Sequence, residues 1–287
     1  MKGIILAAGK GSRLYPITYE TPKPLLPIYD KPMIYYPLST MVSLGIKDIL
    51  LIVDEANLAR YQDLLGDGKK LGLSIEYLVQ YVQRGIADAF ILAEDFIGQD
   101  DVCLLLGDNL FCSDTNDWLE SMTADKFSSG AVVTAYRVRD PERFGVVEFN
   151  DDLKVISLEE KPKIPKSNYI VPGLYFYDNR VVEIAKKVQP SARGELEITS
   201  VNQAYLELDE LSVVIVDKTV SWFDTGTVDS MQEGSDYIRS HLSSYIGMPE
   251  VESHRRGLLT DQDILKLSEF MGPTKYAERL REYIQNK

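Results

Sequence analysis

The sequence predicts an α/β fold built on a doubly wound, mostly parallel sheet, and three observations support this prediction. Apolar runs alternate with single amphipathic segments through the first half of the chain. The runs are continuously apolar, as in strands that are buried on both faces. The first run also ends in a loop rich in glycine, which is a common position for a ligand in such folds.

In the first half of the chain, strands and helices alternate after an initial strand. The next strands are expected at 48–53, 74–79 and 102–106, and helices at 32–45, 57–65 and 86–96. One helix between consecutive strands is the pattern of βαβ units, which place helices on both faces of a parallel sheet. Ligands of such sheets lie beyond the carboxyl ends of the strands.

The second half is richer in strands. They are expected at 131–138, 146–149, 155–159, 170–177 and 211–216, with helices at 180–188, 195–208 and from 227 onward. Glycine, proline, serine and charged residues cluster at 245–256 and suggest a boundary. We therefore expect a core at 1–242, divided into 1–129 and a β-rich part at 130–242, followed by a small helical appendage at 243–287. The appendage is too short to fold alone and should dock on its own core or on a neighbouring subunit.

Composition restricts the classes of partner. The chain has 287 residues, 26% of them charged, and a formal net charge of −13. Such an acidic chain should bind neither a nucleic-acid backbone nor an anionic membrane. Two cysteines cannot form a disulfide framework, and neither a secretion signal nor a membrane-spanning segment is visible. We expect a cytoplasmic protein.

The glycine loop carries the first candidate chemistry. Residues 2–13 read KGIILAAGKGSR, and residues 21–27 read TPKPLLP. Glycines let backbone N–H groups approach an anion, while Arg13 and Lys23 supply two cations, the second on a segment stiffened by prolines. These groups suit a triphosphate. The loop is not a Walker loop, since no Gly-Lys-Ser/Thr closes it, and it lacks the third glycine of the dinucleotide fingerprint.

Two aspartates are candidate metal ligands. Asp108 follows the apolar run 102–106, and Asp224 stands in WFDTG at 222–226. Mg²⁺ in nucleotide sites takes one or two carboxylates together with phosphate oxygens, so we predict Mg²⁺ as the cofactor. The alternative is a pair of ordinary turn residues at strand ends. The chain has only two histidines, His241 and His254, which makes a histidine triad or histidine zinc site improbable.

A third group of residues could bind a phosphorylated sugar. Glu160 and Lys161 stand side by side before a proline, and Arg193 follows in SARGELEIT at 191–199. A carboxylate can bind sugar hydroxyls while cations bind the sugar phosphate. The alternative is that the tetrapeptide EEKP at 159–162 carries only an exposed charge pair at a strand end.

The motifs and their order resemble the sugar-1-phosphate nucleotidyltransferases, and from residue 1 to about 242 the glucose-1-phosphate thymidylyltransferases. The motifs that carry this resemblance are the glycine loop with PKPLLP, YDKPMIYYPLS at 29–39, LLGDG at 64–68, LGDN at 106–109, DPERFGVV at 140–147, LEEKP at 158–162 and SARGELEIT at 191–199. It implies a nucleotide part at 1–129 and a sugar part at 130–242.

The resemblance also assigns the site residues. Nucleotide binding is implied for Ala8, Gly9, Gly11, Ser12, Arg13, Lys23, Gln80 and Gly85, with Gln80 and the backbone at Gly85 reading the pyrimidine. Sugar-phosphate binding is implied for Asn109, Gly145, Glu160, Lys161, Val171 and Arg193. The catalytic set is Arg13, Lys23, Asp108 and Asp224, and the two aspartates hold the metal.

The implied reaction is Mg²⁺-dependent transfer of a nucleotidyl group from dTTP to glucose 1-phosphate, giving dTDP-glucose and pyrophosphate. The resemblance further implies a homotetramer and an assembly or regulatory role for 243–287. Three departures leave the base open: Ala8 replaces a usual glycine, Pro24 a usual glutamine, and YVQR at 81–84 replaces small polar residues. The alternatives are a UTP-dependent uridylyltransferase and, from another class, a non-catalytic nucleotide-sugar sensor.

Overall fold

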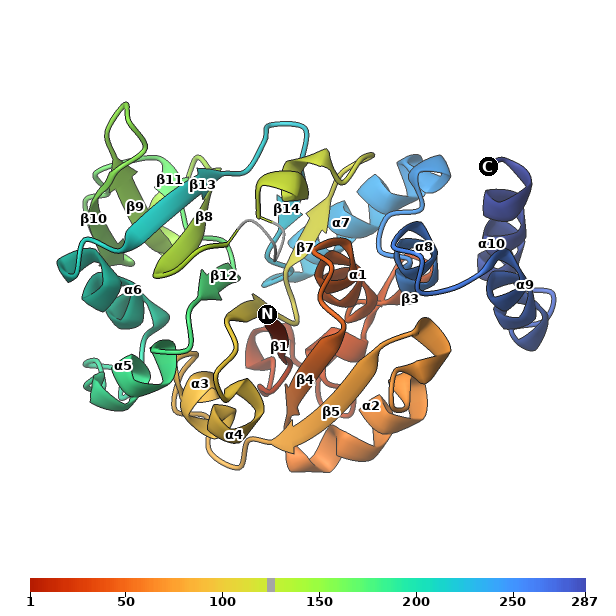
Figure 1. Ribbon diagram of the computed structural model, residues 1–287, viewed down its shortest axis with the longest axis horizontal. Helices are drawn as coiled ribbons and strands as arrows, with labels where there is room; N and C mark the ends of the chain where they lie inside the picture. Colours follow the sequence, from red (N-terminus) through yellow and green to blue (C-terminus); the bar gives the residue numbers. More distant parts are fainter. Residues whose placement is uncertain (123–126) are drawn as a thin grey trace.

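The computed structural model describes residues 1–122 and 127–287 and centres on a ten-stranded sheet (Figure 1). The strand order is β10-β9-β11-β8-β12-β6-β1-β4-β5, and β13 pairs with β8. The strands of this sheet are β1 Lys2–Leu6, β4 Asp48–Val53, β5 Ser74–Val79, β6 Val102–Leu106, β8 Ala131–Arg137, β9 Gly145–Phe149, β10 Val155–Glu160, β11 Tyr169–Ile170, β12 Leu174–Tyr177 and β13 Leu211–Ile215.

The helices and two small sheets surround this sheet. The helices are α1 Tyr35–Ser43, α2 Leu58–Leu65, α3 Asp88–Leu92, α4 Glu94–Ile97, α5 Val181–Lys187, α6 Ile198–Glu207, α7 Val228–Ser240, α8 Pro249–Arg255, α9 Asp261–Phe270 and α10 Lys275–Gln285. One small sheet pairs β7 Leu110–Cys112 with β14 Ser221–Phe223, and the other pairs β2 Pro27–Ile28 with β3 Lys31–Pro32. No helix in the described part of the chain has the length and apolar character needed to cross a membrane.

The parallel half of the sheet determines where a ligand can bind. Strands β6, β1, β4 and β5 are parallel, and Leu6 is in register with both Leu106 and Ile52. The chain builds β4 and β5 on one side of β1 and then places β6 on the other side. This reversal creates a switch point between β1 and β6, where doubly wound sheets bind ligands. The predicted fold class is confirmed, and both the glycine loop and Asp108 follow strands that end at this point.

Both faces of the parallel strands are buried, which explains their continuous apolar sequences. Ile4, Leu50 and Ile52 pack into one apolar cluster that includes residues of α3, α5 and α6. Their neighbours Ile5 and Leu51 pack into a second cluster with residues of α1 and α2. Because successive side chains of a strand point to opposite faces, burial on both faces requires apolar residues at every position.

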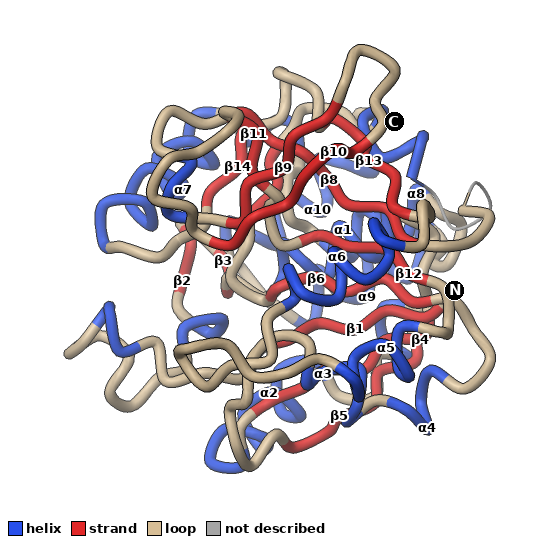
Figure 2. Tube along the Cα trace, turned by 90° about the vertical axis from the view of Figure 1, so that its left-hand side faces the viewer, coloured by secondary structure: helices blue, strands red, loops and turns tan. Residues whose placement is uncertain are grey.

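The β-rich half differs from its prediction at one point. Figure 2 shows β8 to β11 gathered in one half of the molecule and β1, β4 and β5 in the other. The single strand expected at 170–177 is two strands, since β11 pairs with β8 and β9 while β12 pairs with β6 and β8. The break between β11 and β12 includes Pro172, which has no N–H to donate to a neighbouring strand. It also includes Gly173, where a Cβ would lie 2.6 Å from Leu106.

Two predicted helices also have different bounds. The helix expected at 86–96 consists of the short helices α3 and α4, which meet at Ala93, a residue outside helical geometry with ψ of 12°. The helix expected from 195 begins at Ile198, because Glu197 has the extended backbone of an N-cap position. Residues 195–197 are therefore free to form part of a cavity wall.

The stretch 245–256, where we expected a boundary, packs against the core. This stretch contains α8, which lies beside α1 (Figure 1), with Val251 and Ser253 fully buried. Pro249 occupies the first turn of α8, where its missing N–H is harmless. Ser43 of α1 donates a hydrogen bond of 2.8 Å to Glu252, and the appendage therefore docks on its own core.

The helices after α8 are α9 and α10, and α10 also contacts the core. Thr260 and Asp263 form a reciprocal capping box at the start of α9. From α10, the buried Arg279 forms a 2.6 Å ion pair with Asp30 and donates to the carbonyl of Leu242.

Candidate active site

The carboxyl ends of β1 and β6 open into a cavity of about 500 Å³ that reaches the β-rich half. A second hollow of about 500 Å³ lies over the glycine loop and shares part of its wall with the first. The shared residues are Leu6, Ala8, Gly9, Arg13, Gln83, Ile86, Leu106, Asp108 and Glu195. Every residue that we predicted for the site lines one or both of these joined hollows.

Glycine is required by the shape of the loop after β1. Gly9 has a φ of 140° and Gly11 a φ of 57°, values that L-residues with side chains rarely adopt. A Cβ on Gly11 would also lie 3.0 Å from Thr18. Thr18 donates a 2.7 Å hydrogen bond to the Gly11 carbonyl, which stabilises the conformation of the loop. The loop leads into a helical turn at Ser12–Leu14 that carries Ser12 and Arg13.

Lys23 connects the two predicted metal ligands. It is only 7% exposed, and its Nζ donates to Asp108 Oδ2 at 2.6 Å and to the backbone carbonyl of Asp224 at 3.1 Å. The other oxygen of Asp108 accepts a 3.0 Å hydrogen bond from Asn109. Trp222 donates in turn to the Asn109 amide oxygen at 2.7 Å. The predicted site residues at this end thus form one connected network.

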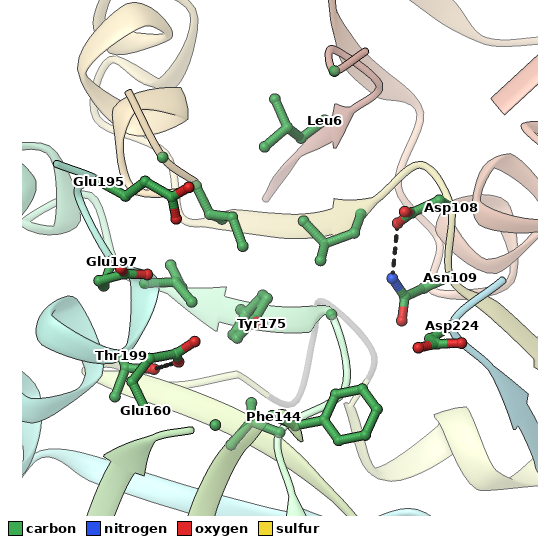
Figure 3. A pocket seen from close by; sticks show the side chains of 18 of the residues that line it. Leu6, Asp108, Asn109, Phe144, Glu160, Tyr175, Glu195, Glu197, Thr199 and Asp224 are labelled. Atoms are coloured by element: carbon green, nitrogen blue, oxygen red, sulfur yellow. Dashed lines mark hydrogen bonds between the residues drawn. The ribbon is translucent and has the colours of Figure 1, made fainter. Parts of the chain in front are cut away.

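Asp224 follows β14 and is held by its neighbours. Gly226 N–H donates to Asp224 Oδ1 at 3.1 Å, and Arg143 lies 3.5 Å from the other carboxylate oxygen. Thr225, in the left-handed region at φ 43°, donates a 2.6 Å hydrogen bond to the Asp108 carbonyl. Figure 3 shows Asp108, Asn109 and Asp224 together at one side of the cavity.

The donor set at this end fits a nucleotide-bound magnesium ion. The described residues contain no group of three or more histidine, cysteine or acidic side chains able to hold a metal by themselves. Magnesium needs only one or two carboxylates when phosphate oxygens and water complete its shell. Asp108 and Asp224 supply two such carboxylates beside the glycine loop.

The opposite side of the cavity is built from charged side chains. Glu160 and Thr199 lie across the cavity from Asp108 and Asp224 (Figure 3), and Thr199 donates a 2.6 Å hydrogen bond to Glu160 Oε2. The other oxygen of Glu160 lies 3.5 Å from Lys161 Nζ and 3.4 Å from Arg193.

Three glutamates surround Arg193. Its guanidinium lies 2.9 Å from Glu197, 3.4 Å from Glu195 and 3.4 Å from Glu160. Partial burial alone would lower the pKa of Arg193, but the hydrogen bonds to Glu197 and the nearby glutamate charges raise it above its ordinary value. The guanidinium therefore stays charged, and an anionic ligand must share it with these carboxylates.

Two further glycines let backbone segments approach the site closely. Gly85 has a φ of 113°, and a Cβ there would lie 2.5 Å from the Leu196 carbonyl oxygen. The hydrogen bond from Ala87 N–H to the same carbonyl, at 3.1 Å, ties the loop after β5 to the wall that carries Glu195 and Glu197. Similarly, a Cβ on Gly145 would lie 3.2 Å from Thr199 Oγ1, and the Gly145 carbonyl accepts a 2.8 Å hydrogen bond from Val171 N–H.

The sequence prediction missed several residues of the cavity wall. They are Gln83, Arg143, Phe144, Tyr175, Glu195, Glu197, Thr199, Asn202 and Trp222. Arg143, Phe144, Glu195, Glu197, Thr199 and Trp222 stand inside motifs that were recognised, so position in a motif was an available signal. Nothing local indicates that Arg143 reaches Asp224, which lies 81 positions away.

A doubly wound sheet with a glycine loop and Asp108 at its switch point, and with Asp224 beside them, is typical of nucleotide-binding enzymes. The chain belongs to the Nucleotidyl transferase family, whose profile matches residues 2–241. Over 98% of both chains it is 49% identical to the glucose-1-phosphate thymidylyltransferase of Neisseria meningitidis. Over the full length of both chains it is 44% identical to the glucose-1-phosphate thymidylyltransferase of Mycolicibacterium smegmatis.

Solved structures agree with this assignment. A Bacillus anthracis protein assigned as a glucose-1-phosphate thymidylyltransferase, solved with sucrose, is 44% identical and superposes with a TM-score of 0.76, covering 83% of this chain and 95% of that one. A UDP-glucose pyrophosphorylase with UDP-glucose bound has a TM-score of 0.73 at 23% identity over 83% of this chain and 98% of that one, and shares the fold. The predicted identity as a nucleotidyltransferase is confirmed.

Proposed function

We propose that this nucleotidyltransferase transfers a thymidylyl group from dTTP to glucose 1-phosphate, with Mg²⁺, and releases dTDP-glucose and pyrophosphate. The observation that carries the proposal is that one pair of joined cavities contains the glycine loop and paired aspartates at one end and Glu160, Lys161 and Arg193 at the other. The names of the full-length relatives support the choice of substrates.

The roles of the residues follow from the charges of the substrates. The glycine loop and Arg13 would bind the triphosphate, while Lys161 and Arg193 would hold the phosphate of the sugar. An oxygen of that phosphate then attacks the α-phosphorus in line, the bond from the α-phosphorus to the bridging oxygen breaks, and pyrophosphate leaves. The attacking phosphate is already an anion near neutral pH, so the reaction needs no general base.

Catalysis in this proposal consists of positioning and charge neutralisation. Lys23 would offset charge on the transferring phosphoryl group, and Asp108 and Asp224 would hold Mg²⁺. The ion would supply further positive charge at the phosphate oxygens when bound. Glu160 would accept hydrogen bonds from the sugar hydroxyls.

The test is pyrophosphate release measured across a panel of nucleoside triphosphates and sugar 1-phosphates, with and without a chelator. We expect turnover with dTTP and glucose 1-phosphate that the chelator abolishes and added Mg²⁺ restores. A clear preference for UTP would favour the uridylyltransferase alternative. Binding of a nucleotide sugar without any turnover would favour the sensor, and efficient use of GTP or ATP would refute the pyrimidine assignment.

The segment 243–287 has a separate proposed role. None of its residues lines the joined cavities, so we propose that it serves assembly or regulation, with a homotetramer as the expected assembly. Sedimentation of the full chain at several concentrations tests the assembly role, and a single-chain mass throughout would contradict it.

A further inference from the structure

The side chain of Gln80 is held in place by two charged residues of the following segment. Gln80 directly follows β5 and is only 5% exposed. Its Nε2 donates a 3.0 Å hydrogen bond to Asp88 Oδ2. Asp88 is 1% exposed in the first turn of α3, and its other oxygen lies 2.7 Å from Arg84 Nη2. These three residues form a chain from the cavity wall to the surface, where Arg84 is about half exposed.

This contact fixes which end of the Gln80 amide is available to a ligand. An ionised carboxylate only accepts hydrogen bonds, so the NH₂ group of Gln80 must face Asp88. The amide oxygen then points away from Asp88, and no described residue donates to it. Gln80 lines the cavity at the carboxyl ends of β1 and β6 together with Gln83 and Gly85. The amide oxygen of Gln80 is therefore a free acceptor at the nucleotide end of the site.

An acceptor with a fixed position can distinguish pyrimidine bases. Thymine and uracil carry a proton on N3, whereas N3 of cytosine is a bare acceptor. An amide oxygen that faces N3 attracts the first two bases and repels the third. A glutamine free to rotate by 180° would present its NH₂ group to cytosine and lose this distinction.

We propose that Asp88, paired with Arg84, is a positioning residue that locks the Gln80 amide and so makes the nucleotide site select thymine or uracil over cytosine. The proposal rests on the proposed function and on the prediction, implied by the family resemblance, that Gln80 reads the pyrimidine.

The surroundings hold this contact in place. A buried carboxylate without a partner is costly, and Arg84 supplies the countercharge. The loop between the two charged residues is itself tied down, because Leu196 N–H donates a 2.6 Å hydrogen bond to the Arg84 carbonyl and Gly85 leaves room for this approach.

The test compares kcat/KM for dTTP, UTP and dCTP in the wild type and in three variants. Asp88→Asn offers both a donor and an acceptor to Gln80, so the ratio of dTTP to dCTP should fall about 10-fold. Arg84→Ala should shift the ratio in the same direction by less. Asp95→Asn, the same chemical change at an exposed position on α4, should leave it unchanged.

The ratio within one preparation does not depend on how much of the protein is folded, so partial unfolding cannot move it. An unchanged dTTP to dCTP ratio in Asp88→Asn would overturn the proposal. If that variant does not fold, the ratio in Arg84→Ala decides, since its side chain lies at the surface. A wild-type enzyme that uses neither dTTP nor UTP would refute the proposed function itself. A selective wild type whose variants are equally selective would refute only the role given to Asp88.

Discussion

The two ends of the active-site cavity hold their cations in different ways. At the nucleotide end, Lys23 is buried and bound to Asp108 and to the carbonyl of Asp224, in a network completed by backbone groups and short side chains. At the sugar end, Arg193 and Lys161 are about half exposed and contact long, flexible glutamates. We call the first the rigid end, because Lys23 is buried and hydrogen-bonded to two protein oxygens, and the second the flexible end, because a ligand must share its half-exposed cations with the glutamates that contact them.

This difference should separate the kinetic effects of the two ends. A rigid group that acts on the transferring phosphoryl contributes mainly to kcat, because its interaction is made in the transition state. A cation that must leave a glutamate to bind the sugar phosphate contributes mainly to the binding of that substrate. Substitutions at matched positions can show whether this division is real.

The largest effect is expected from Asp108→Asn and Asp224→Asn. Each removes one charged ligand for Mg²⁺ and should lower kcat on the order of 10²–10³-fold while the fold persists. Asp108→Asn should have the greater effect, because it also leaves the buried Lys23 without its carboxylate. Circular dichroism and turnover at limiting Mg²⁺ provide the measurement, with the exposed Asp152→Asn as the control. Near-normal turnover of either variant would contradict the metal assignment.

Lys23→Met is the next strongest test of the rigid end. Methionine fills a similar volume but removes the charge, so kcat should fall on the order of 10²-fold while KM for glucose 1-phosphate stays nearly constant. Steady-state kinetics with each substrate varied in turn would show this. A large rise in the sugar KM with an unchanged kcat would mean that Lys23 belongs functionally to the other end.

Arg193→Gln tests the flexible end. Loss of a charge-assisted contact should raise KM for glucose 1-phosphate on the order of 10-fold or more, with little change in KM for dTTP. Glu195→Gln is the matched control, because it removes one of the carboxylates that compete for Arg193 and should leave the sugar KM equal or lower. If both variants raised the sugar KM equally, competition between substrate and glutamates would be the wrong description.

The same contrast explains how much the sequence could predict. The nucleotide end is built from one short segment, 8–13, with Lys23 nearby and aspartates that directly follow apolar runs. Local patterns therefore located Arg13, Lys23, Asp108 and Asp224, and the structure brings them together. Strand bounds in this half were also predictable, since β4, β5 and β6 match the apolar runs 48–53, 74–79 and 102–106.

The remaining features depend on contacts between distant segments, which no local pattern reveals. The bond from Thr199 to Glu160 and the approach of Arg143 to Asp224 join residues 39 and 81 positions apart. The hydrogen bond from Gln80 to the buried Asp88 is likewise visible only in three dimensions. The helix α8 within 245–256 was not predicted either, because its burial against α1 is visible only in three dimensions.

The smallest effect is expected from Thr199→Val, which changes one hydrogen bond at the flexible end. Valine is close to threonine in volume but cannot donate to Glu160, which then keeps only the weaker contacts to Lys161 and Arg193 at 3.5 and 3.4 Å. A hydrogen bond to a charged group is worth about 1.5–3 kcal/mol, but these two cations can move closer and recover part of it. We therefore expect KM for glucose 1-phosphate to rise only about 3- to 10-fold, with kcat and the melting temperature nearly unchanged. Thr199→Ser keeps the hydroxyl and should restore the wild-type value. A loss of kcat in Thr199→Val as great as that of Lys23→Met would show that the sugar end is as rigid as the nucleotide end, and the contrast between them would fail.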